Sequence, residues 1–200
     1  MWNFSKFRNN VALIDVNERV FYKDLIFYSS EIKKKIEKKS LTVMLADNSL
    51  SSVICYISLV KKRLPVLILD YKISKKFLNK IVKLYKPQNI CLSIENFFFK
   101  NNKNYKLNFK FKSFQFLKNI KKDTFQVKNN LSILATTSGS TGSTKLIRQS
   151  YNNIKSNTSS IIQYLKLKKD NTTITNLPLS YTFGMSIINT HLEAGSKIIV

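Results

Sequence analysis

Apolar residues in the first half of the chain follow two alternating patterns, one typical of helices and one of buried strands. Tyr22, Leu25, Ile32 and Ile36 recur at helical spacing and predict an amphipathic helix. Short, continuous apolar runs at 41–46, 65–70 and 89–93 have the length of strands that are covered on both faces. Further helical faces lie between these runs, formed by Val53, Tyr56, Ile57 and Val60 and then by Phe77, Leu78, Ile81 and Tyr85.

Polar residues mark the expected ends of these helices. Asp47, Asn48 and Ser49 are candidates for the N-cap of one helix, Ser74 is the candidate for the next, and Pro87 stops that helix. Strands separated by amphipathic helices are typical of βαβ units. The sequence therefore predicts an α/β fold with a parallel or mixed sheet flanked by helices.

The pattern changes between residues 95 and 128, where aromatic residues alternate with lysine and asparagine. Tyr105, Leu107, Phe109 and Phe111 have period-two spacing, and the phase slips at Ser113. We expect a pair of strands with these apolar residues facing inward, the lysines in water, and a bulge or turn near Ser113. Stacking of nucleic-acid bases on these aromatics is the alternative, but strands buried on one face are far commoner.

The alternation of strands and helices resumes at residue 131. Strands are expected at 131–135 and 172–175 and from 197 onward. One helix is expected to begin near Ser150, and another to run through Ile187 and Ile188 and end at Gly195. The polar loop 136–145 is expected to lead from the first of these strands directly into the helix that Ser150 caps.

The chain is strongly basic, with 34 Lys and Arg against 11 Asp and Glu and a net charge of +23. Such a charge attracts polyanions and acidic membranes. The lysines form no single compact tract, and the abundance of Lys, Asn and Ile is typical of an A- and T-rich genome. We therefore interpret most of the charge as solvated surface, and nucleic-acid binding is the less favoured interpretation.

Other features favour a cytoplasmic protein without a structural metal. Cys55 and Cys91 form no CxxC pair and are expected to be buried, small apolar residues. No apolar signal-peptide core occurs in the first fifteen residues, and the apolar stretch at 53–60 is too short to span a bilayer. His191, with Glu193 as the only carboxylate at useful spacing, is interpreted as structural.

The main candidate for chemistry is the segment 138–145. It contains two of the four glycines of the chain, Gly139 and Gly142, and it ends at Lys145. Small residues let backbone N–H groups point at an anion, while hydroxyl groups and an ammonium group add donors and charge. The hydroxyl residues are Ser138, Ser140, Thr141, Ser143 and Thr144. A Walker P-loop requires glycine immediately before the lysine, so Thr144 excludes that motif.

Thr137-Ser-Gly-Ser-Thr-Gly-x-x-Lys145 resembles the phosphate-binding signature of the adenylate-forming superfamily, which contains acyl-CoA synthetases, adenylation domains and luciferases. Residues 150–154 resemble the capped helix of the family, and 177–184 resemble its next core motif. Residues 12–15, 22–25 and 67–70 match the usual opening of the large N-terminal domain. The resemblance covers nearly the whole chain, as the N-terminal part of an AMP-binding domain over residues 1–200.

This resemblance implies a ligase that uses ATP, with Mg²⁺, to activate a small carboxylate as an acyl-adenylate. Coenzyme A, or the phosphopantetheine of an acyl carrier protein, then usually takes the acyl group. Tyr181, Phe183 and Gly184 would border the acyl pocket, Lys145 would be catalytic, and no protein residues are assigned to a metal. The residues expected to hold the phosphates are Thr137, Ser138, Gly139, Ser140, Thr141, Gly142, Thr144 and Lys145.

The chain departs from the family pattern at two positions and ends before several family elements. Thr144 and Leu146 stand where the family usually has proline and glycine. An aromatic residue or histidine commonly follows the Pro-Leu pair of the family, and Tyr181 fills that role. The expected adenine and ribose contacts, hinge and small C-terminal domain would follow Val200. We therefore expect the chain alone to be incomplete for catalysis. The alternatives are an inactive truncated remnant and a basic nucleic-acid-binding domain.

Overall fold

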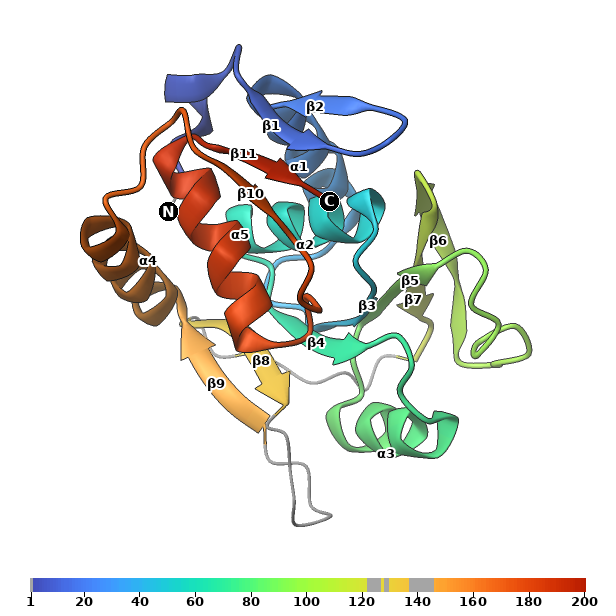
Figure 1. Ribbon diagram of the computed structural model, residues 1–200. Helices are drawn as coiled ribbons and strands as arrows, with labels where there is room; N and C mark the ends of the chain where they lie inside the picture. Colours follow the sequence, from blue (N-terminus) through green and yellow to red (C-terminus); the bar gives the residue numbers. More distant parts are fainter. Residues whose placement is uncertain (1, 122–126, 128–129, 137–145) are drawn as a thin grey trace.

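The computed structural model describes residues 2–121, 127, 130–136 and 146–200. Two sheets lie one above the other with helices between them (Figure 1). The larger sheet has the strand order β6-β7-β5-β3-β4-β8-β9, and the smaller has the order β10-β11-β1-β2. The predicted α/β class with a mixed sheet flanked by helices is confirmed.

Parallel strands form the centre of the seven-stranded sheet. These are β5 (Asn89–Ser93), β3 (Thr42–Ala46), β4 (Val66–Asp70) and β8 (Leu131–Thr136). Antiparallel strands close both ends, with β7 (Phe114–Asn119) and β6 (Tyr105–Phe111) at one end and β9 (Leu146–Ser150) at the other. The central strands are buried along almost their whole length, which explains their continuous apolar sequences.

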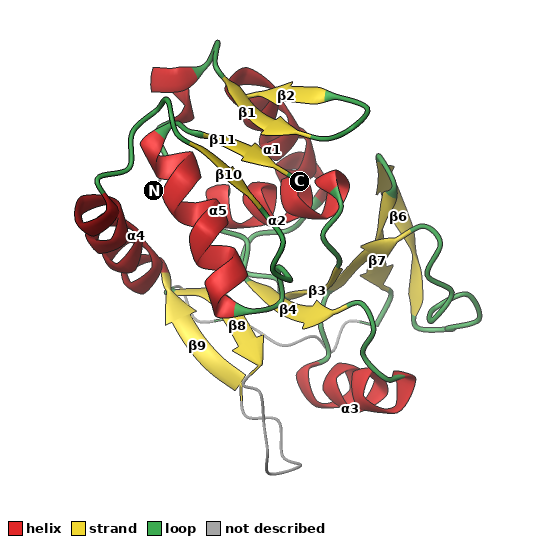
Figure 2. Cartoon of the chain, in the orientation of Figure 1, coloured by secondary structure: helices red, strands yellow, loops and turns green. Residues whose placement is uncertain are grey.

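Helices α1 (Tyr22–Lys35), α2 (Leu50–Lys61) and α5 (Thr182–Ala194) lie between the two sheets (Figures 1 and 2). Every residue of α2 from Leu50 to Val60 is buried, as is usual for a helix that is apolar on all sides. Ser49 caps this helix by accepting a hydrogen bond from the Ser52 N–H at 3.3 Å. Gly195, at φ +80°, ends α5 as predicted.

Helix α3 (Lys75–Tyr85) covers the opposite face of the large sheet (Figure 2). Its Leu78 and Ile81 pack in one apolar cluster with Val43 and Leu69 of the central strands. Helix α4 (Tyr151–Leu165) lies beside α5, and Ser150 caps it as predicted. In the described part of the chain, no helix is long and apolar enough to cross a membrane.

The sequence patterns did not predict the smaller sheet in full. Strand β1 (Val11–Ile14) pairs antiparallel with β2 (Arg19–Phe21) and parallel with β11 (Lys197–Ile199), which pairs in turn with β10 (Thr172–Ile174). A 3₁₀ helix, η1 (Phe4–Phe7), precedes β1. Strands of three and four residues are too short to show a clear alternation, so only their partners in space define them.

The predicted alternation along β6 is wrong in one respect, because a β-bulge interrupts it. The pairing register shifts between Leu107 and Phe109, so Tyr105 and Leu107 lie on the α3 side while Phe109 and Phe111 lie on the α1 side. Leu107, predicted to face inward, is therefore largely exposed. The phase slip at Ser113 is the turn between the strands, where Lys112 has φ +49°.

Both cysteines are buried and free, in agreement with their interpretation as small apolar residues. Cys55 is on α2 and Cys91 on β5, and both belong to the apolar cluster between the sheets. Burial is the main reason why the pKa of the Cys91 thiol is raised, and the neighbouring Cys55 raises it further. The Cys91 thiol is therefore protonated and unreactive at neutral pH.

Candidate active site

The carboxyl ends of three neighbouring parallel strands meet at one edge of the large sheet. These strands are β3, β4 and β8, and they end at Ala46, Asp70 and Thr136. The chain passes from β3 to β4 on one side and then returns to β5 on the other side of β3. Ligands of open α/β sheets bind outside the carboxyl ends of strands, next to such a reversal of strand order. The predicted phosphate loop begins at this edge.

The residues on either side of the predicted phosphate loop are paired strand neighbours. Thr136 at the end of β8 lies opposite Leu146 at the start of β9, and the pairing continues to Leu131 and Ser150. The expectation that the loop leads directly into a helix was wrong, because β9 intervenes before α4 begins at Tyr151. Leu146 packs against the apolar cluster on the α3 side, which fixes the first residue of this strand.

The predicted phosphate-binding residues themselves lie outside the described residues. They are Thr137, Ser138, Gly139, Ser140, Thr141, Gly142, Thr144 and Lys145. Their role as a phosphate cradle stays a prediction. The described neighbours fix only where the segment starts and ends, at the carboxyl edge of the sheet.

The second motif, residues 177–184, is held against the same edge of the sheet. The Leu179 N–H donates to the Asn48 side-chain oxygen (Oδ1) at 3.2 Å, and the Leu179 side chain is buried in the core. The Ser180 hydroxyl donates to a carboxylate oxygen (Oδ2) of Asp70 at 3.3 Å. Asn48 follows β3 and Asp70 ends β4, so the strand ends fix the position of this motif.

Gly184 lies so close to the backbone of residues 177–178 that a residue with a Cβ atom would clash there. A Cβ atom added at Gly184 would lie 2.4 Å from the Pro178 carbonyl oxygen and 3.1 Å from that of Leu177. Both are backbone atoms of the segment that leads into α5, so they cannot move aside as the end of a flexible side chain would. Glycine is the residue type that such close backbone contact requires.

We expect Gly184→Ala to destabilise the chain by about 1–3 kcal/mol, the usual cost of forcing an extra methyl group into a packed site. The measurement is the midpoint of urea unfolding at constant slope. Ser186→Ala, two residues later on the same helix, is the matched control and should change stability by less than about 0.5 kcal/mol. Equal midpoints for the two variants would show that Gly184 is not required for this contact.

A cleft of about 530 Å³ lies between α4, α5 and β9. Its described lining contains amide, hydroxyl and apolar side chains and no charged group. The lining residues are Gln149, Asn153, Ile154, Asn157, Ile161, Thr182, Phe183, Met185, Ser186 and Asn189. A cavity of this size with an apolar floor and a few polar groups is typical of a small-molecule site.

Asn189 is one of the polar residues that line this cleft. Its side chain is only 5% exposed, and its Oδ1 accepts a 2.8 Å hydrogen bond from the hydroxyl of the buried Tyr56. Burial raises the pKa of Tyr56, so this hydroxyl keeps its proton and needs an acceptor. The Asn189 NH₂ group is thereby turned away from Tyr56. It is the candidate donor of this residue for a ligand in the cleft.

The structure brings only part of the predicted acyl pocket to this cleft. Phe183 lines it, with 66% of its side chain exposed. Gly184 is buried against the preceding backbone, and Tyr181 is the exposed N-cap residue of α5, outside the described lining. The roles of these three residues stay predictions. The amide residues of α4 and Asn189 could not be identified from the sequence, because isolated asparagines on a helix carry no recognisable motif.

His191 and Glu193 make contacts that maintain the fold. The His191 Nδ1 atom lies 2.8 Å from the Ile187 carbonyl oxygen of its own helix, and desolvation lowers its pKa. Glu193 accepts a hydrogen bond from the backbone N–H of Trp2. Neither side chain lines the α4–α5 cleft, so both contacts agree with the structural interpretation of His191.

Comparison with solved structures finds the same fold in several proteins. MatB from Rhodopseudomonas palustris aligns with a TM-score of 0.72 and 14% identity, over 98% of this chain and 44% of its own. The o-succinylbenzoate coenzyme A synthetase MenE from Bacillus subtilis, in complex with AMP, aligns with a TM-score of 0.75 and 16% identity, over 100% and 55%. VinN in complex with L-aspartate aligns with a TM-score of 0.75 and 14% identity, over 98% and 60%.

The chain thus spans about half the length of these structures, and at these identities the likeness concerns the fold. A search of curated protein sequences found no significant match. A family model described as "AMP-binding enzyme" matches residues 31–200, which is most of the chain. The chain therefore belongs to the AMP-binding enzyme family.

Proposed function

We propose that this chain provides the phosphate-binding part of an ATP-dependent ligase that activates a carboxylic acid. The observation that carries the proposal is the family match over residues 31–200. The geometry supports it, because the loop at 137–145 starts at the carboxyl edge where Asn48 and Asp70 hold the second motif. The residue that precedes the first motif, Thr136, and the second motif therefore lie at the same edge of the sheet.

In the proposed reaction, a carboxylate oxygen of the acid attacks the α-phosphorus of ATP. The bond between this phosphorus and the oxygen bridging to the β-phosphate breaks, and pyrophosphate leaves. A thiol sulfur, from coenzyme A or from the phosphopantetheine of an acyl carrier protein, then attacks the acyl carbon and releases AMP. Such transfers depend on positioning and on stabilisation of the developing charge.

Each part of the site has a proposed role in this reaction. Backbone N–H groups of Gly139 and Gly142, hydroxyl groups of the loop, and Lys145 would hold the β- and γ-phosphates. Mg²⁺, which accompanies ATP in one MenE structure, would neutralise part of the phosphate charge. Phe183 and Asn189 would contact the acyl group in the cleft between α4 and α5.

The chemistry of the cleft favours an acid whose remaining part is polar but uncharged. Its described lining offers amides and hydroxyls and no cation that would pair with a second carboxylate. Burying an unpaired charge in such a site is costly, whereas the NH₂ group of Asn189 would bind a hydroxyl or carbonyl oxygen. We therefore propose monocarboxylic acids with a neutral polar chain as substrates.

The test is ATP- and acid-dependent release of pyrophosphate. The 200-residue chain, and the same protein with any sequence that follows Val200, are assayed with hydroxy acids, fatty acids and dicarboxylic acids. We expect activity with uncharged hydroxy acids in the longer protein and little activity in the 200-residue chain. Activity with none of the acids in either protein, together with steeply salt-dependent RNA binding, would instead support a nucleic-acid-binding domain.

A further inference from the structure

A second cleft lies at the opposite end of the large sheet from the candidate active site. It has a volume of about 490 Å³ and is formed by β6, β7 and the loop 94–104. Strand β6 is one edge of the sheet and β9 is the other, so four strands separate this cleft from β9. The loop 94–104 projects at the right margin of the molecule in Figure 1. No role in the proposed ligase reaction falls to this region.

Three large apolar side chains that line this cleft are exposed to solvent. Phe97 is 68% exposed, Leu107 is 53% exposed and Ile94 is 41% exposed. The bulge in β6 places Leu107 on the α3 side of the sheet, where helix α3 covers the central strands. Exposed apolar residues that cluster in this way mark interaction sites, whereas isolated ones do not.

The cleft has a rigid floor under these exposed side chains. Phe99 and Tyr105 are buried there, with ring centroids 5.3 Å apart in an edge-to-face arrangement. The Tyr105 hydroxyl donates to the Pro87 carbonyl oxygen at 2.8 Å, which fixes the ring. The exposed apolar groups are therefore presented on an ordered base.

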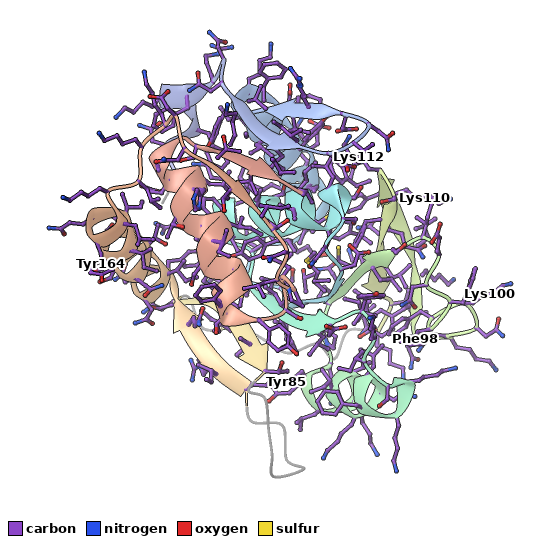
Figure 3. All side chains as sticks on the ribbon, in the orientation of Figure 1. Tyr85, Phe98, Lys100, Lys110, Lys112 and Tyr164 are labelled. Atoms are coloured by element: carbon purple, nitrogen blue, oxygen red, sulfur yellow. The ribbon has the colours of Figure 1, made fainter. Side chains whose placement is uncertain are left out.

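Positive charge surrounds these apolar groups. Between residues 95 and 121 the sequence has seven lysines and one acid, Glu95. Lys112 pairs with Glu18 and Lys118 pairs with Glu37, while Lys100 and Lys106 line the cleft itself. Figure 3 shows Lys100 at the outer margin, beyond Phe98. The surface thus combines unbalanced lysines with exposed apolar side chains.

We propose that this surface, defined by Ile94, Phe97, Leu107, Lys100 and Lys106, docks on an anionic lipid bilayer. Phe97 and Leu107 enter the boundary between head groups and acyl chains, and the lysines contact anionic head groups. Aliphatic Ile94 and Leu107 have no stacking face for nucleic-acid bases, which disfavours RNA as the partner. A projecting margin also reaches a flat bilayer before the rest of the molecule does.

The test is co-sedimentation of the purified chain with vesicles of phosphatidylcholine alone or with about one third phosphatidylglycerol. We expect binding only to the anionic vesicles, with part of it retained in 0.5 M NaCl (about ten times the low-salt buffer), because apolar insertion is not screened. The double variant Phe97→Ser/Leu107→Ser should bind these vesicles at least about tenfold more weakly than the unaltered chain. Lys100→Gln/Lys106→Gln should bind more weakly at low salt and lose part of its salt dependence.

The matched control is Tyr164→Ser/Leu165→Ser, which removes two exposed apolar side chains from α4. It should change vesicle binding less than about twofold, since the proposed bilayer-docking surface is unaltered in this variant. Equal vesicle binding by Phe97→Ser/Leu107→Ser and by this control would overturn the proposal. Complete release of the unaltered chain from the vesicles by salt would also overturn it. Loss of RNA or acidic-peptide binding in Phe97→Ser/Leu107→Ser, with vesicle binding intact, would assign the surface to that partner instead.

Discussion

Trp2→Ala is expected to lower the free energy of unfolding by about 3–5 kcal/mol, the usual cost of removing a buried tryptophan side chain. Trp2 is only 1% exposed and stacks on Phe4 at a centroid distance of 5.6 Å. Its Nε1–H donates to the Asn189 carbonyl oxygen at 3.1 Å. Its backbone is held on both sides, by Glu193 at the N–H and by Lys61 at the carbonyl.

Trp2 therefore joins the start of the chain to α2 and α5, and its loss should also loosen the wall of the α4–α5 cleft at Asn189. Urea unfolding followed by far-ultraviolet circular dichroism measures the effect. Trp2→Phe keeps a ring but removes the Nε1–H donor, so it should be destabilised less than Trp2→Ala. Tyr164→Ala, at an 83% exposed position, should change stability by less than about 0.5 kcal/mol. A Trp2→Ala variant as stable as Tyr164→Ala would contradict this account.

The central part of the fold could be predicted from the sequence because local signals agreed with one another. The run 41–46 is mostly apolar and is bounded by Ser40 and Asp47. Ser49 and Ser74 cap the two helices that follow. Burial on both faces gave each central strand an unmistakable continuous pattern. These elements form the parallel core of the sheet.

The elements that were missed depend on partners distant in the chain. Strand β9 has little alternation of its own, and its pairing with β8 defines it. The bulge at Leu107 and Phe109 leaves no local mark, because the alternation in sequence continues through it. Register is a property of a strand pair, so a single strand cannot reveal where the register shifts.

The sequence offers a candidate site where suitable side chains are concentrated in one segment. Clustered glycines and hydroxyl residues before Lys145 indicated a phosphate loop, and its position at the carboxyl edge of β8 fits that interpretation. The contacts of Asn48 with Leu179 and of Tyr56 with Asn189 join residues more than 130 positions apart. Asn48 was expected only as one of three possible helix caps, and its contact with the second motif could be found only in three dimensions.

Lys145→Ala is expected to reduce acyl-adenylate formation by about 30- to 900-fold, which corresponds to about 2–4 kcal/mol of transition-state stabilisation. Lys145 is the only cation in the segment 137–145, and this segment begins where β8 ends at the carboxyl edge of the sheet. Negative charge accumulates on pyrophosphate as it departs, so an ammonium group placed there acts mainly in the transition state. ATP–pyrophosphate exchange, in a protein that shows the activity, measures this step.

The matched control is Lys155→Ala, which removes an exposed lysine from α4 while changing the net charge equally. It should leave exchange nearly unchanged, because an exposed charge at that position is screened by solvent and salt. Lys145→Arg should recover part of the rate, since it keeps the charge but places it with different geometry. If Lys145→Ala and Lys155→Ala exchange pyrophosphate at the same rate, the cation at position 145 does not contact the phosphates, and the resemblance at this position is one of sequence alone.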